Sequence, residues 1–62
     1  MSSNAEISTM QKSELYDLLM LKAENEKDGI DTKGLDKLIN KKKAVMAAED
    51  VAYVEKIIGE LK

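Results

Sequence analysis

The stretch ENEKDGIDTKGL, residues 24–35, places carboxylates before a glycine between two predicted helices, as in the loop of a calcium-binding EF-hand. If Glu24 takes the first loop position, Gly29 falls at the sixth, where that loop turns sharply. The twelfth position should supply a bidentate glutamate, but here it is Leu35. We therefore expect no calcium site and interpret the acidic residues as a solvated helix end and loop.

Lysine is the other residue type whose spacing could support binding. All ten basic residues are lysines, and within residues 32–47 five lysines against one aspartate leave a net charge of +4, although the whole chain carries −2. Lys33, Lys37 and Lys41 follow i, i+4 spacing and form a basic ridge on a helix. We interpret the ridge as a solvated face that pairs with acidic neighbours. The alternative is contact with an acidic protein surface or with nucleic acid, and the absence of arginine disfavours nucleic acid.

Catalytic equipment is missing from the composition. The chain has no histidine and no cysteine, which removes the usual zinc ligands, the usual general base near neutral pH and every Ser-His-Asp or Cys-His arrangement. No glycine-rich phosphate loop is present. We therefore predict a protein that is not an enzyme, with no catalytic, cofactor or metal site and no small-molecule substrate.

The first helix is predicted over about residues 9–27. Ser8 and Gln11 have the spacing of a capping box, and Gly29 is placed to adopt the left-handed conformation that ends helices. The small polar residues before this cap predict a disordered N-terminal tail over residues 1–8.

Two further helices are predicted, over about residues 32–47 and 50–61, and Asp31 or Thr32 can cap the first of them. One uninterrupted helix is possible on propensity alone. However, the apolar stripe of residues 35–46 and that of residues 51–61 point roughly 120° apart on a straight helix, so one neighbour cannot bury both. We therefore place a turn near residues 48–50, with Asp50 as the N-cap of the third helix.

These elements predict one helical domain over residues 9–62. With only two aromatic residues, the core must be aliphatic, which suits helix packing. The predicted fold is an all-α, small three-helix bundle. The alternative is a two-helix hairpin that dimerises into a four-helix bundle.

The first helix carries apolar residues around most of its circumference. Leu15, Leu19 and their neighbours form one face, whereas Met10, Leu18 and Leu21 lie on another side. A helix that touches two others needs a wide apolar arc, and we favour that explanation. The alternative is that Met10, Leu18 and Leu21 bind another chain.

The function that remains is a small protein-protein interaction or regulatory protein, which docks an apolar helix face onto a protein partner or onto its own copy as a homodimer. The alternative function is a lysine-dependent module that binds nucleic acid or an acidic surface. No apolar run reaches the roughly 20 residues that span a bilayer, and no secretory signal is visible, so we expect a cytoplasmic protein. These residues do not assign the chain to a family.

Overall fold

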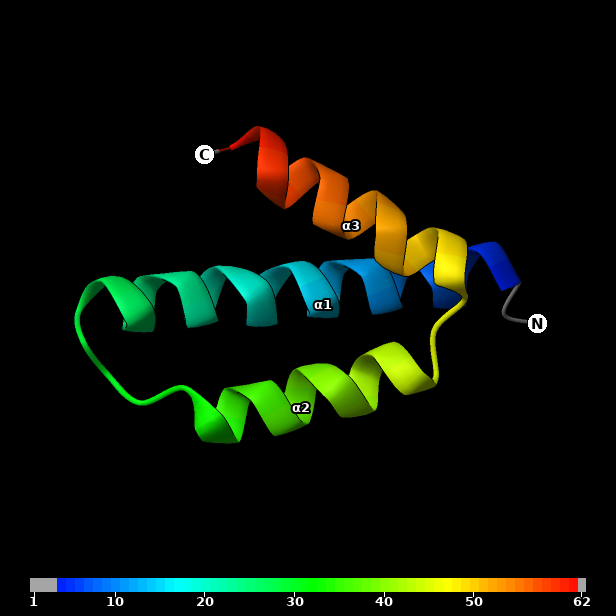
Figure 1. The fold of residues 1–62 in the computed structure, drawn as a ribbon. Coiled ribbons are helices and arrows are strands. Elements are labelled where there is room, and N and C mark those ends of the chain that lie inside the picture. Colours follow the sequence, from blue (N-terminus) through cyan, green and yellow to red (C-terminus); the bar gives the residue numbers. More distant parts are fainter. Residues whose placement is uncertain (1–3, 62) are drawn as a thin grey trace.

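The computed structural model describes residues 4–61 and contains three helices within them, α1 (Asn4–Lys27), α2 (Lys33–Ala44) and α3 (Ala48–Glu60). No strand occurs in these residues. α2 runs antiparallel to α1, and α3 returns in the direction of α1 (Figure 1). The all-α prediction of a small three-helix bundle is confirmed.

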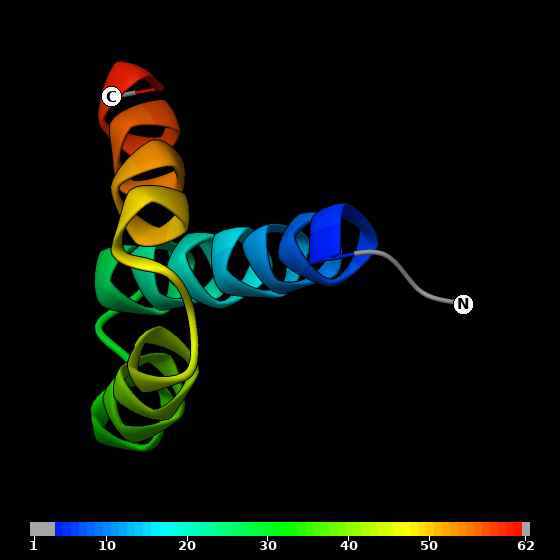
Figure 2. The same cartoon turned by 90° about the vertical axis from the view of Figure 1, so that its right-hand side faces the viewer.

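α1 is the central element, because both other helices pack on it and contact each other only weakly. A view along the molecule places α2 and α3 on different sides of α1 (Figure 2). α1 is also twice as long as α2, with 24 residues against 12. This arrangement explains why α1 needs apolar residues around so much of its circumference.

The core is small and takes one residue from each helix and one from a loop. Leu15 of α1, Ile39 of α2, Val54 of α3 and Met46 of the α2–α3 connection are the buried hydrophobic residues. Leu15 and Val54 are the two fully buried side chains of this cluster. The half-buried side chains of Tyr16, Leu18, Leu19, Val51 and Ile58 pack around it.

α1 ends as predicted. Gly29 has a φ of 74°, which an L side chain adopts only with strain. The N–H of Gly29 donates to the Glu26 carbonyl at 3.1 Å, and the N–H of Ile30 donates to the Asn25 carbonyl at 2.7 Å. These two bonds form a Schellman motif, which satisfies carbonyls that the helix end would leave without partners.

The start of α1 differs from the prediction. The helix begins at Asn4, so the expectation of a disordered tail is wrong for residues 4–8, whereas residues 1–3 lie outside the described part. Ser8 does not cap the helix, because it lies inside α1 and its hydroxyl donates to Asp50 Oδ2 at 2.7 Å. Nothing in residues 4–8 breaks a helix, and Glu6 in the first turn suits the positive end of the helix dipole.

α2 begins close to its predicted position. The Lys33 N–H donates to Asp31 Oδ1 at 3.0 Å, so Asp31 is the residue that satisfies an exposed donor there. Thr32 occupies the N-cap position but makes no side-chain capping bond.

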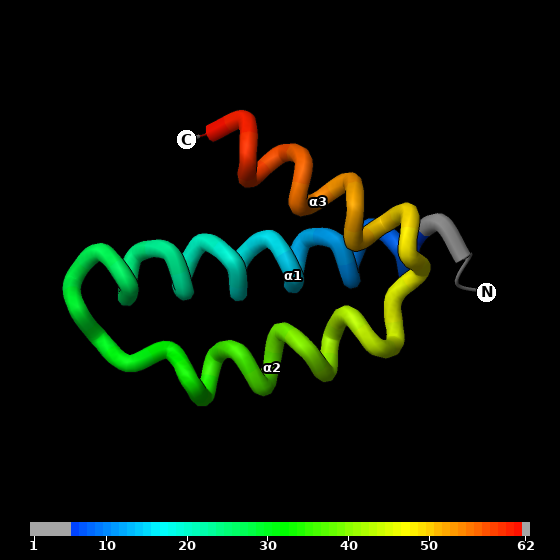
Figure 3. The backbone as a smooth tube through the Cα atoms, in the orientation of Figure 1, coloured from blue at the N-terminus to red at the C-terminus, as the bar shows by residue number. Residues whose placement is uncertain are grey.

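The predicted break between the second and third helices is present, but it lies at residues 45–47 rather than 48–50 (Figure 3). The alternative of a two-helix hairpin is therefore wrong. Met46, within this connection, is buried in the core and only 8% exposed.

Asp50 is not the N-cap of α3. The N-cap is Ala47, whose carbonyl accepts from the N–H groups of Asp50 at 3.0 Å and Val51 at 3.1 Å. Asp50 lies in the first turn, and its carboxylate accepts the hydroxyl of Ser8 from α1. Asp50 thus connects α3 to α1 and also places a negative charge in the first turn of α3.

We expect Asp50→Ala to lower the free energy of unfolding by about 1 kcal/mol, because a half-buried hydrogen bond to a charged group and a favourable first-turn charge are both lost. Asp50→Asn should cost less, since its amide oxygen still accepts. Urea denaturation of Asp50→Ala, Ser8→Ala and the double variant measures the coupling. Strictly additive costs would contradict the bond between the two side chains.

Candidate functional site

The three residues predicted to bind a partner are separated by the structure. Met10 and Leu21 are 58% and 45% exposed, whereas Leu18 is half-buried and packs against the core. Met10 and Leu21 are eleven residues apart, about three helical turns, so they lie on one line along α1. Leu18 lines the junction with the rest of the bundle and does not extend this exposed line.

α2 and its C-cap contribute two exposed apolar side chains that belong to the predicted apolar stripe of residues 35–46. Leu38 is 52% exposed and Val45, which follows the last residue of α2, is 69% exposed. They are two turns apart and therefore share one side of the helix. The signal was present in the sequence, because both lie about 100° or more from buried Ile39 on a helical wheel.

Two ion pairs set the register between α1 and α2. Lys22 Nζ lies 2.7 Å from Asp36 Oδ1, and Lys42 Nζ lies 3.0 Å from Glu14 Oε2. In this antiparallel pair, Leu38 is therefore level with the region of Leu18 to Leu21.

The Glu14–Lys42 ion pair also shows that the exposed apolar residues of α1 and α2 lie on the same side of the α1–α2 hairpin. Glu14 is one turn after Met10, and Lys42 is one turn after Leu38, so the Glu14–Lys42 pair connects the two exposed stripes. We call this surface the hairpin face. It consists of Met10, Leu21, Leu38 and Val45, with the Glu14–Lys42 pair across its middle.

α3 packs on α1 away from the hairpin face and contacts α2 only weakly. Lys43 of α2 pairs with Glu55 of α3 at 3.2 Å. From α1, the ammonium of Lys12 lies 4.9 Å from the centroid of the Tyr53 ring. On a helical wheel Lys12 and Lys43 each point about 100° or more away from the hairpin face. The hairpin face is thus a side of the hairpin that α3 leaves uncovered.

The three lysines of the predicted basic ridge, Lys33, Lys37 and Lys41, are exposed, and their ammonium groups make no ion pair within the described residues. Lys42 and Lys43 from the same charged run are instead paired with acidic residues of α1 and α3. The expected pairing with acidic neighbours therefore holds for those two residues only.

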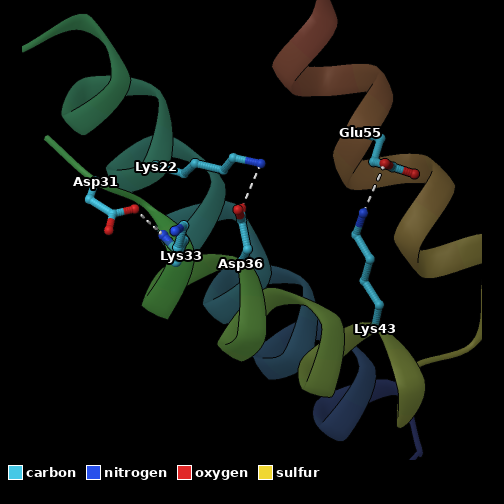
Figure 4. A network of polar contacts seen from close by, with 6 residues as sticks. All are labelled: Lys22, Asp31, Lys33, Asp36, Lys43 and Glu55. Atoms are coloured by element: carbon cyan, nitrogen blue, oxygen red, sulfur yellow. Dashed lines mark hydrogen bonds and ion pairs between the residues drawn. The ribbon is translucent and has the colours of Figure 1, made fainter. Parts of the chain in front are cut away.

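The polar contacts shown in Figure 4 join all three helices. Asp36 of α2 raises the pKa of Lys22 above the ordinary lysine value of 10.5, through a hydrogen bond first and charge attraction second. Because the pKa of Lys22 is raised in the folded state, the stabilisation from the Lys22–Asp36 pair is fully present below the ordinary lysine pKa. It is lost as the pH rises through the raised pKa of the folded protein. Lys22 is therefore charged, and its pair with Asp36 intact, across the neutral range.

The edges of the hairpin face carry opposite charges. On α1, the exposed residues Asp17 and Glu24 lie beside the Met10–Leu21 line, on the side away from α2. On α2, Lys41 borders the Leu38–Val45 line on the side away from α1, Lys37 lies at that edge, and Lys33 points about 120° or more away from the line. The face therefore has exposed apolar residues toward both ends, the Glu14–Lys42 pair between them, acidic residues along its α1 edge and lysines along its α2 edge.

A hollow of about 500 Å³ lies along the N-terminal half of α1 and is lined by Glu6, Thr9, Met10, Ser13 and Glu14. All five residues come from one helix, so no second element encloses the space. Among residues 4–61, no group of three or more acidic, histidine or cysteine side chains is placed to hold a metal ion. The same residues contain no helix long and apolar enough to cross a membrane.

The fold defines a class: a small three-helix protein in which the second and third helices both pack on the long first helix. Comparison with protein-family models, with curated proteins and with solved structures found no match for this chain.

Proposed function

We propose that this protein is a small, non-catalytic interaction or regulatory protein that docks onto protein through the hairpin face. The observation that supports the proposal is the position of Met10, Leu21, Leu38 and Val45, which are 45–69% exposed and lie on two neighbouring helices. Scattered exposed apolar residues are ordinary on protein surfaces, whereas a patch with a charged rim is typical of a protein contact. Exposed apolar residues on two neighbouring helices suit contact with a helix of the partner.

The proposal predicts that Leu21→Glu abolishes partner binding without unfolding the protein, because the side chain is half exposed and a charge there remains hydrated. Wild type and variant are immobilised and exposed to extract of the producing cell, and bound proteins are quantified by mass spectrometry. The matched control is Leu61→Glu, since Leu61 is also an exposed leucine, 59%, but lies after the end of α3.

The expected result is a set of proteins, including the differently tagged protein itself, that wild type and Leu61→Glu bind and that Leu21→Glu loses at least about tenfold, the size of effect a central interface residue produces. Circular dichroism must show the helical content unchanged in both variants. Equal binding by all three proteins would contradict docking through the hairpin face.

A second candidate function is binding of nucleic acid or another acidic surface through Lys33, Lys37 and Lys41. Their exposure and lack of ion pairs within the described chain favour it. The acidic edge on α1 and the net charge of −2 oppose it for nucleic acid. This function requires affinity that falls steeply with salt and is weakened by Lys37→Glu with Lys41→Glu. No mobility shift with DNA or RNA at low salt would exclude the nucleic-acid version.

A further inference from the structure

We infer that the occupant of the hairpin face is a second copy of this chain, in a two-fold symmetric dimer that stacks α1 of each copy on α2 of the other. This inference rests on the proposed function, because it uses the same face. The observations behind it are the opposite charges of the two edges and the register between α1 and α2.

The charges select one of two symmetric arrangements. If the two-fold axis runs across the helices, α1 faces α1 and α2 faces α2, so the acidic edges meet and the lysine ridges meet. If the axis runs along the helices, α1 of one copy faces α2 of the other, so each acidic edge meets a basic ridge. Like charges at an interface are repulsive, and a two-fold interface repeats every contact twice. The second arrangement is therefore the favoured one.

The register then decides which charges meet. Because Lys22 pairs with Asp36 and Glu14 with Lys42, α1 and α2 residues that lie level have numbers adding to about 57. Rotation about an axis along the helices does not change the position of a residue along that axis. The same pairs of residues are therefore level between the two copies. Lys41 comes level with Asp17 of the other copy, and Lys37 comes level with the stretch between Asp17 and Glu24.

The apolar residues match in the same register. Leu38 comes level with the region just before Leu21 of the other copy, and Val45 comes level with the region just after Met10. At the centre, Lys42 comes level with Glu14 of the other copy. Both Glu14–Lys42 pairs therefore stay neutralised when the faces close over them, which avoids a buried unpaired charge.

The size of the face sets the expected strength. The 12 residues of α2 extend over about 18 Å, and two helices packed about 10 Å apart are about 20 Å wide. The contact then covers roughly 400 Å² on each copy, about 800 Å² in total, which is below the size of stable interfaces and in the range of weak, transient ones. We expect a reversible dimer with a dissociation constant in the micromolar range or weaker.

The test uses two charge-reversal variants whose mutated side chains make no ion pair within the described chain. The acidic variant is Lys37→Glu with Lys41→Glu, and the basic variant is Asp17→Lys with Glu24→Lys. Sedimentation equilibrium of the full chain, from about 10 µM to about 1 mM at low salt, measures the mass of each variant, of wild type and of an equal mixture of the variants.

Wild type should dimerise, each variant alone should be at least about tenfold weaker, and the mixture should form a heterodimer. Restoration in the mixture is the decisive result, because a folding defect in either variant cannot produce it. High salt should weaken the wild-type dimer.

A monomeric wild type at the highest concentration would overturn the inference, as would wild-type association by either variant alone or no association in the mixture. Failure of the dimer and failure of the proposed function remain distinguishable. A monomeric wild type that still captures another protein in a Leu21-dependent manner overturns the second copy as occupant and supports docking by the hairpin face.

Discussion

Leu15→Ala is expected to remove most of the free energy of unfolding of this protein. Leu15 is 0% exposed, and α1, which carries it, is the one helix against which both others pack. Truncating a buried leucine to alanine typically costs about 3 kcal/mol, and the core of a domain this small rarely supplies more than about 3–5 kcal/mol. Far-UV circular dichroism and urea denaturation measure the loss directly.

The control for this substitution is Leu61→Ala, the same change at a leucine that is 59% exposed. It should change the free energy of unfolding by less than about 0.5 kcal/mol, as expected for a surface position. If Leu15→Ala were no more destabilising than Leu61→Ala, the core around Leu15 would be wrong.

A pair of proline substitutions on either side of the start of α3 has the second-largest expected effect. Ala52→Pro should cost about 3 kcal/mol or more, because it removes a hydrogen bond inside α3 and its ring clashes with the preceding turn. Ala47→Pro should cost less than about 1 kcal/mol, since Ala47 has a φ of −65°, the value that a proline ring imposes. Thermal unfolding followed by circular dichroism ranks the two variants.

This comparison tests the helix break itself. The Ala47 N–H makes no hydrogen bond within the described residues, so a proline there removes none. In one continuous helix over residues 33–60, both prolines would be interior and would cost about the same. Equal destabilisation by Ala47→Pro and Ala52→Pro would therefore contradict the separate α2 and α3.

Ser8 and Asp50 illustrate where reasoning from sequence reaches its limit. Both belong to the residue types that cap helices, and the spacing of Ser8 from Gln11 fits a capping box. In the fold they bond to each other across 42 positions of the chain. A local pattern cannot separate these roles, because the same side-chain oxygens serve a nearby backbone N–H or a distant partner, and only packing of α3 on α1 brings the partner within reach.

Features decided within a few residues followed from the sequence alone. The left-handed position at Gly29 and the Asp31 contact to the start of α2 depend on local backbone geometry. The existence of a break between α2 and α3 followed from two apolar stripes that point in different directions. The composition also determined which side chains are absent, and with them the histidine and cysteine chemistries.

The tertiary structure decided which apolar side chains are covered. Leu18 and Leu21 are both apolar and lie one turn apart on α1, yet Leu18 packs on the core and Leu21 is 45% exposed. Leu38 and Ile39 are adjacent in α2, yet they are 52% and 4% exposed. Periodicity shows that a helix has apolar residues on several sides, but burial depends on where the neighbouring helices lie. Here α3 packs on α1 away from the hairpin face and contacts α2 only weakly, so the apolar residues of that face are exposed.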